Sequence, residues 1–178
     1  NGNEWRAEFD EELAKRLIPR HTGLPYRPTT DSRHERWHAT LNPGVRCSPH
    51  QSGMPYKFWG PCVRHFTYCY NRTVPTGDDQ LTPYERRYGK EFKDTERLHP
   101  FGCRVLHYEN EENRSKFDPT AREGILVGIM ENGYEILDRE DYIKSGHKNT
   151  HFRRTRDVKF FDEEFPFAEE EKFVRLFE

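Results

Sequence analysis

The chain has 178 residues, of which 33% are apolar and 34% are charged, and its formal net charge is −2. Typical soluble domains are about 45–50% apolar and about 25% charged, so clusters of Phe, Tyr and Trp must supply much of any core. No apolar run approaches the roughly 18 residues of a membrane-spanning helix, and no secretory or transit signal is visible. We therefore expect a nuclear or cytoplasmic protein that does not span a membrane.

The charge is unevenly distributed along the chain. From Glu11 to Gly77 there are ten Lys and Arg against four Asp and Glu, whereas from Asp157 to Glu178 there are three against eight. A basic first half with an acidic tail is typical of a surface that faces a polyanion. Ordinary scatter of charge along the chain is the alternative.

The spacing of the cysteines bears on whether the chain contains a metal or redox site. The four cysteines form no C-x-x-C pair, so neither a zinc ribbon nor a redox motif is indicated. Cys62, His65 and Cys69 would share one face of a helix, which suggests either a metal site or, with aromatic residues around them, a core face; the core is favoured. The chain begins with Asn1, which suggests a fragment or a processed piece.

The first predicted helix covers Glu4 to Leu17, where large apolar residues recur every four positions. A basic stretch, Leu24 to Leu41, follows it. Here Asp31 or Ser32 is a good N-cap, and Glu35 stands three residues after Ser32, which is the spacing of a capping box. Alternatively, Glu35 holds a divalent metal ion while the neighbouring arginines attract a polyanion.

Two prolines predict that the next helix is interrupted. Pro43 and Pro49 follow within one would-be helix, and an interior proline costs about 3 kcal/mol. We expect the helix to stop near Leu41 and a second one to begin after Pro43.

The segment from Gly53 to Thr73 has helical spacing, with Gly60 as the expected N-cap and Pro61 in the first turn. Its apolar stripe is expected to belong to the core rather than to stack on bases. The stripe consists of Phe58, Trp59, Val63, Phe66 and Tyr70. Further on, Thr82 should cap a short helix that ends near Tyr88.

The second half changes from helical to strand patterning. Strands are expected at 104–108, 124–130, 134–137 and 156–163, with a hairpin turn at 131–133. Short strands between turn signals predict a small β-barrel. The expected organisation is 1–88, a linker at 89–98, a barrel at 99–163 that folds independently, and an acidic tail at 164–178.

Several motifs resemble copia-type retrotransposon integrases, and the likeness runs from Asn1 to about Glu163. PYRPTTDSRHER resembles P-Y-T-P-Q-Q-N-G-x-x-E-R, and GMPYKFWGPCVRHFTYCYNRT resembles L-P-x-x-F-W…A-x-x-x-A-x-Y-x-x-N-R. LTPYE, HPFGC and RDVKFFDE resemble K-T-P-Y-E, R-x-F-G-C and S-R-D-V-x-F-D-E. The resemblance implies the C-terminal part of an RNase H-like integrase core, mostly helical, followed by an SH3-like β-barrel.

The resemblance also assigns roles to residues. It makes Glu35 the third acid of an Asp, Asp, Glu triad that holds Mg²⁺ for polynucleotidyl transfer. The second acid would stand immediately before Asn1 and the first further upstream, so these residues carry one acid of three. DNA is the implied partner, with further copies of the chain or other parts of a polyprotein as additional ones. The expected nucleic-acid contacts are Arg27, Arg33, Arg36 and Arg46.

Three functions follow from these observations. The first is a fragment of a retrotransposon integrase that binds nucleic acid but does not catalyse by itself, because one carboxylate cannot hold two metal ions. The second is an active integrase whose remaining acids lie upstream. The third is a host protein that uses the barrel for contacts with other proteins.

Overall fold

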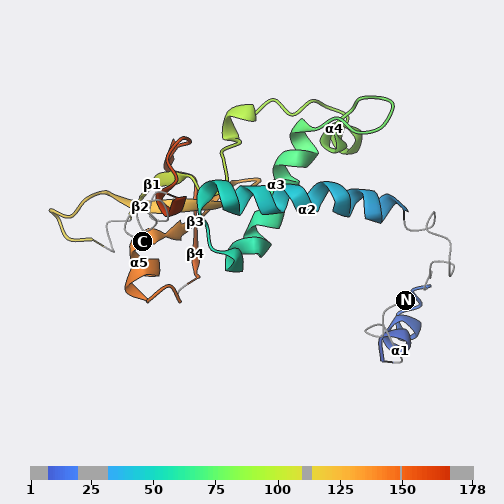
Figure 1. The fold of residues 1–178 in the computed structure, drawn as a ribbon, viewed down its shortest axis with the longest axis horizontal. Coiled ribbons are helices and arrows are strands. Elements are labelled where there is room, and N and C mark those ends of the chain that lie inside the picture. The colour runs from blue at the N-terminus through green and yellow to red at the C-terminus, as the bar shows by residue number, and fades with distance from the viewer. Residues whose placement is uncertain (1–7, 20–31, 110–113, 149, 169–178) are drawn as a thin grey trace, which may run out of the picture. The chain divides into compact units, whose positions relative to one another are not determined.

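The computed structural model describes residues 8–19, 32–109, 114–148 and 150–168. It divides into two units, Asn1–Thr40 and Leu41–Glu178, and the division falls inside one helix. Figure 1 follows the elements along the chain. No described helix combines the length and the apolar character needed to cross a bilayer.

In the first unit, helix α1 covers Glu8–Lys15. Glu12 and Arg16, one turn apart on its exposed surface, form an ion pair at 2.8 Å between Arg16 Nη2 and Glu12 Oε1. The sequence predicted this helix over Glu4 to Leu17; the structure confirms its described part but ends it at Lys15. Leu17 has a φ of 54°, which is not helical.

Helix α2 covers Ser32–Ser52 and contains both Pro43 and Pro49, so the predicted interruption is wrong. Pro49 cannot donate a hydrogen bond to the Val45 carbonyl four residues earlier. The Cys62 thiol contacts that carbonyl instead, with 3.7 Å between Cys62 Sγ and Val45 O. Val45 also packs against the core, and tertiary packing of this kind outweighs local helix propensity.

In the second unit, α2 approaches helix α3, Trp59–Thr73, very closely. A side chain added at Gly44 would stand 2.1 Å from the Phe66 ring, so Gly44 makes this approach possible. A 3₁₀ turn, η2 at Tyr56–Phe58, precedes α3, and Phe58 rather than Gly60 is the N-cap. The predicted N-cap is therefore wrong, because the 3₁₀ turn starts the helix earlier.

The aromatic stripe of α3 is buried only in part. Phe58 is 1% exposed, but Trp59 is 64% exposed. The face that meets the sheet instead carries Cys62 and His65, both buried. The predicted core face is confirmed: Cys62 belongs to a buried apolar cluster, His65 is buried, and half-buried Cys69 packs against a second apolar cluster.

Helix α4, Pro83–Tyr88, begins with the capping predicted at Thr82. The Thr82 hydroxyl accepts a hydrogen bond from the Glu85 amide at 3.2 Å, and Glu85 Oε2 accepts one from the Thr82 amide at 2.7 Å. The guanidinium of Arg72 lies over the Tyr68 ring at 3.4 Å and 5.2 Å from the Tyr84 ring, which ties α4 to α3. A second 3₁₀ turn, η3 at Thr95–Arg97, lies in the predicted linker.

Five strands form one antiparallel sheet in the order β4-β3-β2-β1-β5. Their bounds are β1 Arg104–Tyr108, β2 Ala121–Met130, β3 Gly133–Asp138, β4 Phe152–Thr155 and β5 Val158–Phe161. The hairpin between β2 and β3 pairs Met130 with Gly133, as predicted. Strand β4 and helix α5, Arg139–Lys144, were not predicted.

The helices and the sheet share a core. One cluster of buried residues joins Met54, Phe58 and Cys62, before the linker, to Ile125 and Leu137 in the sheet. Phe101, Val127, Tyr142 and Phe167 complete this cluster. A second buried cluster, Cys103, Val105, Leu126, Ile129, Tyr134 and Ile136, lies within 99–163. The proposed residue boundaries and the independent folding of 99–163 therefore stay predictions.

Candidate functional site

The described site residues expected from the sequence lie in two parts of helix α2. Arg33, Glu35 and Arg36 belong to the first turns of α2, in the first unit. Arg46 belongs to the part of α2 in the second unit. Glu35, Arg36 and Arg46 are all exposed. Arg27 lies outside the described residues, so the structure brings together only the three residues at the start of α2.

The start of α2 offers little for a metal ion by itself. Glu35 is the acid of its first turn. Within residues 8–19, 32–109, 114–148 and 150–168, no group of three or more His, Cys, Asp or Glu is placed to hold a metal ion. Mg²⁺ takes oxygen ligands, usually with more than one acid or a phosphate group among them. The described residues around Glu35 do not fit a Mg²⁺ site without further ligands.

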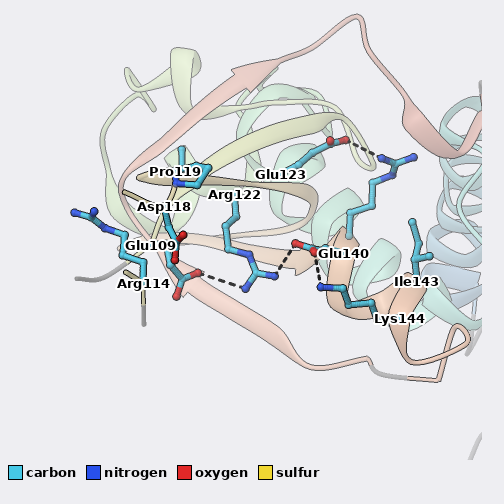
Figure 2. A pocket seen from close by; sticks show the side chains of 11 residues that line it. Glu109, Arg114, Asp118, Pro119, Arg122, Glu123, Glu140, Ile143 and Lys144 are labelled. Carbon is cyan, nitrogen blue, oxygen red and sulfur yellow. Dashed lines mark hydrogen bonds and ion pairs between the residues drawn. The ribbon is translucent and has the colours of Figure 1, made fainter. Parts of the chain in front are cut away.

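A pocket of about 760 Å³ opens on the second unit, beside β2 and α5. Figure 2 shows Arg122 between Glu109 and Glu140, with Lys144 on the far side of Glu140. Arg122 lies 3.6 Å from Glu109, 3.2 Å from Glu140 and 3.2 Å from Asp141. Of the cations that line this pocket, Arg122, Arg139 and Lys144 each pair with an acid.

Arg153 on β4 extends this network through Glu109. Its guanidinium lies 2.8 Å from Glu109 and 3.6 Å from Asp138, and both of these acids are almost completely buried. Burial raises the pKa of Asp138, but His107, the Asp141 amide and the two arginines outweigh it and hold this pKa below its ordinary value. The network links β1, β2, β3, β4 and α5, so we assign it to holding the sheet together.

Cys103, His99 and Asp162 resemble a nucleophilic triad in composition only. His99 Nδ1 lies 2.9 Å from Asp162 Oδ1, and the His99 ring stacks on Phe160 with 3.5 Å between centroids. However, burial raises the pKa of the Cys103 thiol to about 12, and the Asp162 carboxylate adds to this effect. A buried thiol of this kind stays protonated, so it is not an activated nucleophile.

Sequence reasoning missed the ion pairs of Glu135. This residue is buried on β3 and lies 3.1 Å from Arg64 on α3 and 3.1 Å from Arg154 on β4. A signal was present, because a carboxylate inside the apolar strand from Tyr134 to Leu137 needs a charged partner. The identity of the partners was not readable, since they stand 71 and 19 residues away.

A comparison with known families bears on the second half of the chain. Residues 103–173, less than half of the chain, match the family model described as the retroviral polymerase SH3-like domain. The five-stranded antiparallel sheet is consistent with that domain. The match supports a retroelement Pol polyprotein as the setting of this part of the chain.

Proposed function

We propose that the chain is a fragment of a copia-type retrotransposon integrase, in which the C-terminal part of an RNase H-like core precedes the SH3-like domain. The match of residues 103–173 to the retroviral polymerase SH3-like domain carries this proposal. The integrase-like motifs that precede the matched residues, from PYRPTTDSRHER to LTPYE, support the assignment of the core.

The proposed activity of the fragment is binding of DNA without sequence preference, in the nucleus or the cytoplasm. Exposed Arg36 and Arg46 and the excess of cations from Glu11 to Gly77 support it. Cations that contact phosphates release counterions, so such binding weakens steeply with salt. Further copies of the chain or other parts of a Pol polyprotein are the additional partners that this function implies.

Binding is tested with a fluorescent DNA duplex of random sequence at low and moderate salt. The variants Arg33→Gln, Arg36→Gln and Arg46→Gln should each weaken binding, because each removes a cation from the basic half. Lys116→Gln, which removes an exposed cation outside the basic half, is the control and should leave binding unchanged. Absence of binding by the unmodified chain at low salt would contradict the proposed function.

We further propose that these 178 residues do not join DNA ends by themselves. Glu35 supplies one of the three acids that the resemblance implies, and Mg²⁺ enters the proposal only for a complete site. The proposal rests on the missing acids alone, since Pro43 and Pro49 do not break the helix that carries Glu35. The assay is joining of a labelled duplex end to plasmid DNA with Mg²⁺ or Mn²⁺. Metal-dependent joining that disappears in Glu35→Gln would overturn this part of the proposal.

A further inference from the structure

Two arginines from distant parts of the sequence converge on Glu135. Arg64 Nη2 lies 3.1 Å from Glu135 Oε2, and Arg154 donates through Nε and Nη2 to Glu135 Oε1 at 3.2 and 3.1 Å. Arg154 stands directly opposite Glu135 in the pairing of β3 with β4. Arg64 reaches the same carboxylate from α3.

The position of the carboxylate is fixed by the sheet. Gly128 on β2 pairs with Glu135, at an irregularity in the register between Leu126 and Gly128. A side-chain carbon added at Gly128 would stand 3.0 Å from Glu135 Oε2 and 3.3 Å from Glu135 Cβ. Gly128 therefore leaves the space in which the Glu135 side chain lies. Irregularities of this kind redirect side chains and recur near functional sites.

Arg64 and Arg154 are accessible to solvent, although the Glu135 carboxylate that they contact is buried. The side chain of Glu135 is 9% exposed, whereas those of Arg64 and Arg154 are 60% and 72% exposed. A guanidinium has five N–H donors, and Glu135 uses one from Arg64 and two from Arg154. Several donors of each arginine are thus left for another acceptor. The surface beside Arg64 is also open, because a side chain added at Gly60, one turn earlier on α3, would meet no atom within 4 Å.

The charges of this group do not cancel. Two guanidiniums and one carboxylate leave a net charge of +1. Both planar guanidinium groups are held by the same buried carboxylate of Glu135. Their three hydrogen bonds to Glu135 restrict these side chains before binding, which lowers the entropy that they lose on binding. Planar forks of this type suit the bidentate recognition of phosphate oxygens.

We propose that Arg64 and Arg154 form a clamp for one backbone phosphate of a nucleic acid, with Glu135 as the positioning residue. This site lies outside the arginines expected from the sequence, and it rests on the proposed binding of nucleic acid. Because the group carries one net positive charge, it neutralises one phosphate. If either arginine is removed, Glu135 neutralises the other one. Either substitution alone therefore abolishes the net attraction of this group for the phosphate.

The test measures binding of a random-sequence DNA duplex by the whole chain across a series of salt concentrations. Arg64→Gln and Arg154→Gln should each weaken binding several-fold and lower the slope of log affinity against log salt by about 0.9. The triple variant Arg64→Gln, Glu135→Gln, Arg154→Gln removes all three charges and leaves no buried carboxylate unpaired. It should lose no more than either single variant. Lys144→Gln, which removes an exposed cation paired with Glu140, should bind like the unmodified chain.

The outcomes separate this proposal from the proposed function. Binding by the unmodified chain with single variants that bind equally well would overturn the clamp and leave the proposed function standing. If the triple variant loses as much affinity as the two single arginine variants together, Arg64 and Arg154 do not bind one shared phosphate. No binding by the unmodified chain would contradict the proposed function, and the clamp with it. Thermal unfolding of each variant checks that a loss of binding is not a loss of fold.

Discussion

At the scale of single residues, two helical glycines have opposite surroundings. A side chain at Gly44 would collide with the Phe66 ring, whereas one at Gly60 would meet no atom within 4 Å. We expect Gly44→Ala to lower the free energy of unfolding by about 1–3 kcal/mol through overpacking. Gly60→Ala should raise it by about 0.5–1 kcal/mol, because alanine restricts the unfolded chain and suits a helix better.

Denaturant unfolding of both variants checks this prediction. The close approach of α2 and α3 requires the two substitutions to act in opposite directions. Equal effects, or a stabilising Gly44→Ala, would show that the helices do not meet at Gly44.

A second residue-scale prediction concerns the buried His65. Burial lowers its pKa from 6.5 to about 4, although the hydrogen bond from Nε2 to the His99 carbonyl, at 2.9 Å, opposes the shift. The unfolded chain therefore binds this proton near pH 6.5 and the folded chain only near pH 4. Folding stability contributed by His65 is complete above pH 6.5 and is lost as the pH falls toward 4, by about 3 kcal/mol.

The measurement compares unfolding free energies from pH 7 to pH 4 in the unmodified chain and in His65→Gln. The difference between the two should shrink as the pH falls, because glutamine does not take up a proton. His34→Gln, the same change at an exposed histidine, is the matched control. Parallel profiles for the unmodified chain and His65→Gln would contradict the buried, neutral state of His65.

At the scale of elements, the continuity of α2 through Pro43 can be tested by a substitution. In a continuous helix, Pro43 is an interior proline at an exposed position. Pro43→Ala should then raise the free energy of unfolding by up to about 3 kcal/mol. If a second helix began after Pro43 instead, proline would suit that start and alanine would bring no gain. Denaturant unfolding with far-ultraviolet circular dichroism distinguishes the two.

The elements also show which features the sequence could reveal. The capping box at Thr82 and the strand Arg104–Tyr108 were predictable, because their signals lie within a few residues of each other. The continuity of α2 was not, since the Cys62 thiol that contacts the Val45 carbonyl lies 17 residues away. The pairing of Glu135 with Arg64 was hidden for the same reason. Local patterns predicted elements, whereas contacts between elements decided their ends and the candidate binding residues.

At the scale of the molecule, we expect the second half to depend on the core cluster that it shares with residues before the linker. Met54 and Phe58 precede the linker and pack in the same cluster as Ile125 and Leu137 of the sheet. We expect the isolated segment 99–163 to unfold without a cooperative transition, because it leaves this apolar surface exposed. A segment that also includes 41–98 and 164–168 should unfold cooperatively. A sharp transition of the isolated segment at the temperature of the whole chain would contradict the shared core.

The proposed function of the whole chain is binding of nucleic acid through its phosphates. The most direct measurement is the affinity of the whole chain for two DNA duplexes of unrelated sequence over a series of salt concentrations. Phosphate contacts predict equal affinities for the two duplexes and a logarithmic salt slope steeper than about −2, at about −0.9 for each phosphate neutralised. A slope near zero, or strong binding to one duplex and none to the other, would contradict binding through the phosphates.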